Sequence, residues 1–115
     1  NKYNFHRFMR KVEATMNSMI RNGVAWSDGN TCTTYDNDGN CLVYLHGNHI
    51  ATVGDSFMAI FDGGYQSVTT KSRINALCDA FCITGEGVFQ KDFAWYVRYC
   101  VGAINGKSVF TNRND

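Results

Sequence analysis

Apolar residues in the middle of the chain alternate with polar ones between short glycine turns. Residues 41–46, 49–53 and 57–61 each have the composition of a strand, and residues 65–68 are expected to return beside them. Beyond Thr70 the apolar positions recur at steps of three and four, as on one face of a helix. The pattern predicts an antiparallel meander that leads into a helix.

Two amphipathic helices are predicted. The first covers residues 4–22, with Asn4 as its cap and Gly23 at its end; its apolar stripe is Phe5, Phe8, Met9, Val12, Met16, Met19 and Ile20. The second follows a cap at Thr69 or Thr70, and its inner face holds Ile74, Leu77, Cys78, Phe81 and Cys82. This spacing favours core positions for the two cysteines over a redox pair.

A last hairpin closes the chain. It is expected to turn at Lys91-Asp92, with Phe93, Trp95, Val97 and Tyr99 on one face and Trp95 in the core. A turn over residues 102–106 and one more short strand over residues 108–111 follow.

The fold class is α+β, an antiparallel sheet of about five to seven strands packed against both helices. We expect a single domain over residues 1–115, divided into an N-terminal helix (1–23), a β-meander (24–70), a second helix (71–84), a C-terminal hairpin (87–111) and a tail (112–115).

Composition narrows the class of protein. The chain has 115 residues, of which 44% are apolar, enough for one core. No apolar run approaches the ~20 residues of a membrane helix, and no signal peptide opens the chain. The lack of a long apolar run predicts no membrane partner. The five cysteines are an odd number and form no C-x-x-C pair, so in the absence of a secretory signal we expect reduced thiols and a protein of the host cytoplasm.

Charge is distributed unevenly although the net charge is only +1. Residues 22–70 hold no Lys or Arg, yet they carry Asp28, Asp36, Asp38, Asp55 and Asp62. Both ends of the chain are basic. An acidic surface of this kind favours steered encounter with a charged partner, and ordinary solubility is the alternative explanation.

Basic residues suggest two further sites. Lys71 and Arg73 lie at the predicted start of the second helix, where free N–H groups attract phosphate; a capped helix with solvated cations is the alternative. Arg7, Arg10 and Lys11 lie off the apolar stripe of the first helix and could follow a nucleic-acid backbone, or form a solvated face.

The histidines and aspartates offer weaker candidates. A hairpin around Gly47-Asn48 would place His46 opposite His49, where two imidazoles could hold a metal or contact a partner; a third metal ligand is not supplied by the sequence. Residues 36–40 lack the full calcium-loop pattern and predict a hairpin turn. No nucleophile-elbow or metalloprotease spacing occurs, so we expect no catalytic residue, metal or cofactor.

Three pieces of the chain resemble a family of small bacteriophage and mobile-element domains. They are a His46-Gly47 hairpin within residues 44–51, a Gly63-Gly64-Tyr65 turn followed by Thr69-Thr70 and Arg73-Ile74-Asn75, and an aromatic strand that includes Trp95-Tyr96-Val97. The resemblance covers roughly residues 41–98 and leaves out the N-terminal helix. It implies an accessory protein that acts on host machinery, with no catalytic residues to carry over.

Two functions follow from these observations. The first is a non-catalytic inhibitor of a host or defence-system protein complex, for example an anti-CRISPR-like protein, whose acidic middle occupies a basic nucleic-acid-binding surface. The second is a small nucleic-acid-binding protein that uses the basic face of the first helix and the Lys71/Arg73 corner. The oligomeric state is left open.

Overall fold

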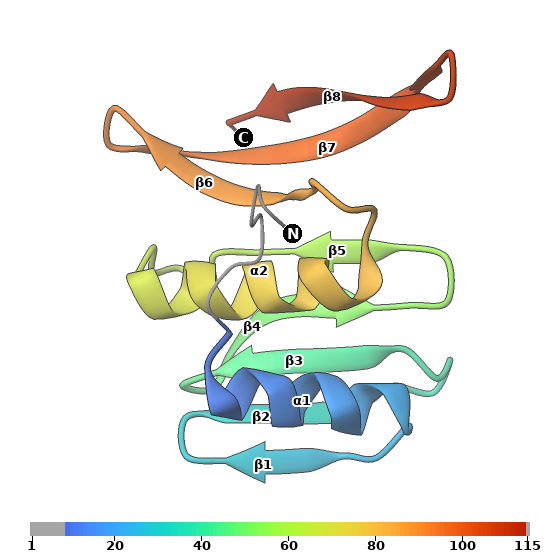
Figure 1. Cartoon of the computed structure of the whole chain (residues 1–115). Helices are drawn as coiled ribbons and strands as arrows, with labels where there is room; N and C mark the ends of the chain where they lie inside the picture. Colours follow the sequence, from blue (N-terminus) through green and yellow to red (C-terminus); the bar gives the residue numbers. More distant parts are fainter. Residues whose placement is uncertain (1–8, 115) are drawn as a thin grey trace.

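The computed structural model describes residues 9–114 and confirms the α+β class. These residues form two helices and eight strands, and the strands divide between two antiparallel sheets instead of forming one (Figure 1). The helices are α1 (Lys11–Arg21) and α2 (Val68–Phe81). The strands are β1 (Trp26–Asp28), β2 (Thr31–Tyr35), β3 (Cys41–Leu45), β4 (Asn48–Val53), β5 (Met58–Ile60), β6 (Gly87–Lys91), β7 (Ala94–Ile104) and β8 (Lys107–Arg113).

The first five strands form an antiparallel sheet in the order of the chain. Successive turns therefore alternate between its two ends. The β1–β2 turn, the β3–β4 turn and the chain after β5 lie at one end, and the β2–β3 and β4–β5 connections lie at the other (Figure 1). This alternation decides which of the predicted site residues can lie together.

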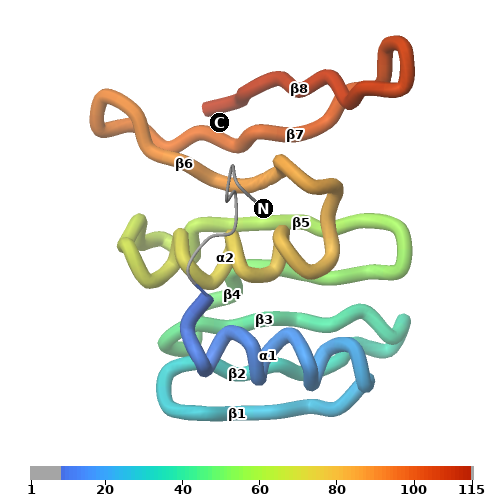
Figure 2. Tube along the Cα trace, viewed as in Figure 1, coloured from blue at the N-terminus to red at the C-terminus, as the bar shows by residue number. Residues whose placement is uncertain are grey.

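Both helices cover the same face of the five-stranded sheet (Figures 1 and 2). Alternate residues of β3 point toward them, which buries Cys41, Val43 and Leu45. A register shift between Val43 and Tyr44 places both Ile50 and Ala51 of β4 inside. The helices supply the other half of the core with Met16, Ile74, Ala76, Leu77 and Cys78, and β6 adds Val88.

Helix α1 begins at Lys11, later than predicted. Arg10 has an extended backbone and precedes the helix, and its N–H donates to Glu13 Oε1 over 3.0 Å. This carboxylate satisfies a donor that the helix leaves free and so fixes its start. Asn4 and the other residues of the predicted helix before Met9 lie outside the described residues. Met16 is fully buried as the apolar stripe requires.

Helix α2 also differs from the prediction at its start. Residues 65–68 do not form a return strand, because the helix begins at Val68. Its cap is Ser67, whose hydroxyl accepts from the Thr70 N–H over 3.0 Å; Thr69 and Thr70 lie inside the helix. The predicted inner positions Ile74, Leu77 and Cys78 are buried, while Cys82 caps the helix and is half-buried.

The second sheet has the order β6-β7-β8. Its first turn is Asp92-Phe93 and not Lys91-Asp92, because Lys91 pairs with Ala94. Phe93 consequently leaves the face on which Trp95 and Val97 pack against the core. Strand β7 runs on to Ile104 through the region predicted as a turn, and β8 is longer than expected, so this hairpin extends past the ends of β6 and α2 (Figure 1).

Candidate functional site

A small pocket forms where α2 begins. Its volume is about 180 Å³, and three segments meet around it: the β3–β4 turn, the chain between β5 and α2, and the first turn of the helix. The structure thus brings the His-Gly hairpin next to the Gly-aromatic turn and the Thr-Thr pair, both of which come much later in the sequence. The residues around the pocket are Leu45, His46, Asn48, Ile50, Asp62, Tyr65, Ser67, Thr69 and Thr70.

The chain between β5 and α2 has its shape fixed by its own side chains. Asp62 accepts from the Gly64 N–H at 2.7 Å and from the Gln66 side chain at 3.2 Å. Gly63 has φ +71°, and a Cβ there would lie 3.1 Å from the Asn48 Cβ atom. The carboxylate of Asp62 therefore already accepts hydrogen bonds within the turn, although the residue is exposed.

The two histidines do not face each other, which corrects the predicted register. The β3–β4 turn is His46-Gly47, and His49 pairs with Tyr44. His46 is exposed in the turn with φ 52°. His49 lies between the rings of Tyr44 and Phe61, with centroids 5.4 and 4.8 Å away. Within residues 9–114 no group of three His, Cys, Asp or Glu side chains is placed to hold a metal ion.

The two cations of the predicted basic corner point in different directions, and neither lines the pocket. The ammonium of Lys71 lies 5.8 Å from the centroid of the Trp95 ring and donates to Gln90 Oε1 over 3.5 Å. Arg73 is only 4% exposed. Of the two, Lys71 is the one that a ligand in solution can reach. A phosphate bound at the start of α2 would therefore contact the helix N-terminus but could not be held by Lys71 and Arg73 together.

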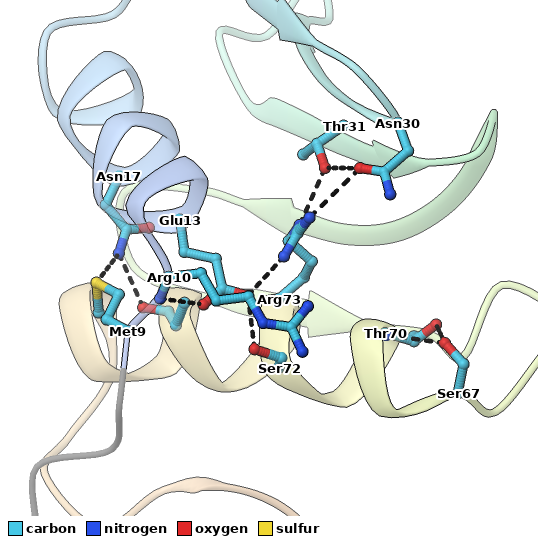
Figure 3. Close-up of polar contacts among 11 residues, drawn as sticks. Met9, Arg10, Glu13, Asn17, Asn30, Thr31, Ser67, Thr70, Ser72 and Arg73 are labelled. Atoms are coloured by element: carbon cyan, nitrogen blue, oxygen red, sulfur yellow. Dashed lines mark hydrogen bonds and ion pairs between the residues drawn. The ribbon is translucent and has the colours of Figure 1, made fainter.

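Arg73 instead joins α2 to α1 and to the β1–β2 turn (Figure 3). One guanidinium nitrogen lies 2.7 Å from Glu13 Oε2 in a buried ion pair. Its Nε donates to the Thr31 hydroxyl over 2.9 Å and a second terminal nitrogen donates to Asn30 Oδ1 over 3.3 Å. Glu13 also accepts from the Ser72 hydroxyl at 2.6 Å. Sequence reasoning missed the role of Glu13, since neither helix alone shows which residue it will meet.

The five aspartates of the predicted acidic surface lie at opposite ends of the five-stranded sheet. Asp28 and Asp62 are at the end where α2 begins. The other three, Asp36, Asp38 and Asp55, are at the far end in the β2–β3 and β4–β5 connections. Backbone N–H groups of Asn40 and Asp38 donate to the Asp36 carboxylate and lower its pKa, so Asp36 also shapes its turn.

Exposed aromatic side chains gather at the end where α2 begins. We call this surface the aromatic end and define it as Phe61, Tyr65, Val68 and Phe93. Tyr65 is 72% exposed, Val68 is 71% exposed and Phe61 is also exposed. The β6–β7 turn with Phe93 lies at the same end of the molecule, since Lys71 in the first turn of α2 contacts Gln90 and Trp95 beside that turn (Figure 1).

Phe93 has an unusual backbone as well as an unusual exposure. Its φ is 65° and its side chain is 97% exposed. Left-handed φ values at the second position of a two-residue hairpin turn favour glycine, and a bulky residue there carries backbone strain. Neither the turn nor the core accounts for a phenyl ring at this place. The sequence does not reveal this position, because Phe93 continues the alternation of Trp95, Val97 and Tyr99 and is predicted on their face.

The basic face predicted for the first helix is only partly described. Arg7 lies outside the described residues, Arg10 precedes α1, and Lys11 is exposed in its first turn. Neither α1 nor α2, the helices of the described chain, has the length and apolar character that a membrane crossing needs.

Fold and surface together define a small α+β protein with a buried ion pair between its helices and an exposed aromatic end. The family model of the Kyanoviridae Gp96 protein matches residues 9–114, and the chain belongs to this bacteriophage family. The match confirms the phage origin that the resemblance implied. It also includes α1, which the resemblance left out. Searches of curated proteins and of solved structures give no match.

Proposed function

We propose that this phage protein binds a host or bacterial defence protein complex through its aromatic end and inhibits it without catalysis, in the host cytoplasm. The observation that carries the proposal is Phe93. Its ring is 97% exposed on a backbone with φ 65°. A strained, solvent-exposed aromatic residue costs stability, and such costs concentrate at binding sites. An anti-CRISPR-like role is one form of this function.

The chemistry of the aromatic end supports a protein partner. Aromatic side chains dominate the binding energy of protein interfaces because they bury a large rigid area at low entropic cost. Tyr65 and Phe93 stand at this end with their side chains largely in water. A partner with a shallow apolar pocket would desolvate both rings at once.

Asp62 gives this surface a negative charge, and Asp28 lies at the same end of the sheet but on the opposite edge strand, β1. Both are exposed at the end of the sheet where α2 begins. Charged groups at the edge of an interface mainly accelerate and orient the encounter. The partner is therefore expected to present a basic surface around its apolar pocket, as a nucleic-acid-binding complex does. Asp36, Asp38 and Asp55 lie at the far end and are too distant in the fold to share this contact.

Affinity capture followed by reconstitution tests the proposal. Tagged protein is used as bait in host lysate, together with a Tyr65→Ser variant. A matched control carries Val101→Ser and Ile104→Ser, two exposed apolar residues on the projecting β7–β8 hairpin. We expect Tyr65→Ser to lose the partner and the control to keep it. The activity of the purified complex should then fall in proportion to the added protein and reach a constant level at a fixed stoichiometry.

Two results would contradict the proposal. One is capture that is the same for Tyr65→Ser and for the hairpin control, because the aromatic end would then not be the contact. The other is inhibition by far less than a stoichiometric amount of the phage protein. One molecule would then inactivate many copies of the target, as an enzyme does.

A further inference from the structure

The sheet of β6, β7 and β8 has one face that packs on the molecule and one that does not. Val88 and Val97 are cross-strand partners, and both pack on the core. Side chains alternate between the two faces of a strand. Phe89 and Tyr96, the next pair in register, therefore lie on the opposite face, as do Arg98 with Asn112 and Cys100 with Phe110. We call this the outer face; Figure 1 shows β6 beside α2, with β7 and β8 successively farther from the helix.

The outer face carries one aromatic ring on each of its three strands. Phe89 of β6 and Tyr96 of β7 are stacked, with centroids 5.4 Å apart and an interplanar angle of 15°. The guanidinium of Arg98 lies 4.2 Å from the centroid of the Phe110 ring of β8. The rings and the cation form one continuous row, because Arg98 is two residues from Tyr96 along β7 and diagonal to Phe110.

The charge of this sheet is opposite to that of the five-stranded sheet. Residues 87–113 carry Lys91, Arg98, Lys107 and Arg113, with Asp92 as their one acidic residue. By alternation Lys91 and Arg98 share the outer face, and no Asp or Glu occupies a position on it. The carboxylate of the neighbouring Glu86 accepts hydrogen bonds from the backbone N–H groups of Ile83 and Cys100. An anion approaching the outer face meets cations and rings together.

We propose that the outer face binds single-stranded nucleic acid. Unpaired bases stack on aromatic side chains and on Arg guanidinium planes, and basic residues beside them hold the phosphates. Phe89, Tyr96 and Phe110 supply the stacking surface, and Lys91 and Arg98 supply the positive charge. This site goes beyond the proposed inhibitory contact, because it uses another surface and another class of partner. It also differs from the basic helix face that the sequence suggested.

Fluorescence anisotropy with a labelled oligothymidylate of about 12 nucleotides tests this site. We expect binding at low salt, with log K falling against log salt at a slope of about −1.4 for two phosphate contacts on a single strand. Arg98→Ala should make the slope shallower by about 0.7. Tyr96→Leu should weaken binding at least about fivefold, while Tyr96→Phe keeps the ring and the affinity. Lys11→Ala removes an exposed charge on α1 and serves as the matched control.

Three results would overturn the proposal. The first is no anisotropy change at low salt with folded protein, as judged by circular dichroism. The second is binding lost in Lys11→Ala and kept in Tyr96→Leu, which places nucleic acid on α1. The third is a concentration-dependent dimer that Tyr96→Leu converts to monomer, which assigns the outer face to a second copy of the chain.

Discussion

Glu13 and Arg73 lie 60 positions apart in the chain and meet in a buried ion pair of 2.7 Å. Their side chains are 1% and 5% exposed. Glu13 belongs to α1 and Arg73 to α2, and Arg73 also holds Asn30 and Thr31 at the β1–β2 turn. One arginine therefore connects three elements that the sheet alone would leave independent.

Removing one member of this pair should destabilise the fold strongly. Arg73→Met leaves the Glu13 carboxylate buried without its cation, which we expect to lower the free energy of unfolding by about 3–5 kcal/mol. Lys71→Met, two positions away on the surface side of α2, is the control and should cost about 0–1 kcal/mol. Urea unfolding measures both. Equal costs for the two variants would show that the buried pair has no special role.

Replacing both members together should cost less than replacing one. In the double variant Glu13→Leu with Arg73→Met no charge is left buried without a partner, so part of the loss in the single variant is recovered. A double-mutant cycle by urea unfolding gives the coupling energy. A coupling near zero would contradict direct interaction between the two side chains.

The β2–β3 turn should weaken in acid. Backbone N–H groups of Asn40 and Asp38 lower the pKa of Asp36 below its ordinary value of 3.8. A carboxyl whose pKa is lower in the folded state stabilises the fold above the unfolded value, and this contribution is lost as pH falls through the folded pKa. A carboxyl NMR titration should give an Asp36 midpoint below 3.8, and a midpoint at about 3.9 when urea unfolds the chain. A folded midpoint at or above the unfolded one contradicts this account of the turn.

The cysteines should differ in reactivity. A hydrogen bond from the Cys78 thiol lowers the pKa of Cys82, whereas burial raises the pKa of Cys41. Because the thiolate is the nucleophile, iodoacetamide at pH 8 should label Cys82 before Cys41. Mass spectrometry follows both sites. Cys78→Ala should slow the labelling of Cys82 and Cys78→Ser should largely preserve it; an unchanged rate in Cys78→Ala would exclude this cause.

Local patterns predicted the class and much of the core. The alternation of Cys41, Val43 and Leu45 and the helical spacing of Ile74, Leu77 and Cys78 each reflect burial on one face, and all six residues are buried. The division into two sheets was not predictable in this way. Alternation shows which face of a strand is buried, but it does not show which neighbour the strand pairs with.

Two of the errors at the candidate site, those on His46 and Phe93, have a common physical cause. A turn shifted by one residue reassigns every facing pair, so His46 moved out of register with His49 and Phe93 moved from the core face to the surface. Arg73 was misjudged for another reason. A cation in the first turns of a helix suggests an anion site, and only the tertiary contact with Glu13 shows that its charge is already used.

Replacing Phe93 by glycine separates binding from stability and tests the central claim most directly. Glycine relieves the left-handed backbone at this turn, so we expect Phe93→Gly to raise the free energy of unfolding by about 0.5–1 kcal/mol. The same variant should reduce capture of the partner complex at least about tenfold, since an exposed aromatic anchor is lost. Asn105→Gly, at the left-handed position of the distant β7–β8 turn, is the matched control and should keep full capture.

The decisive measurement is therefore partner binding by Phe93→Gly beside its urea unfolding curve. A variant that is at least as stable as the natural chain and has lost its partner is the result that we predict. A variant that is equally stable and still binds the partner with unchanged affinity would contradict the assignment of the aromatic end as the inhibitory surface.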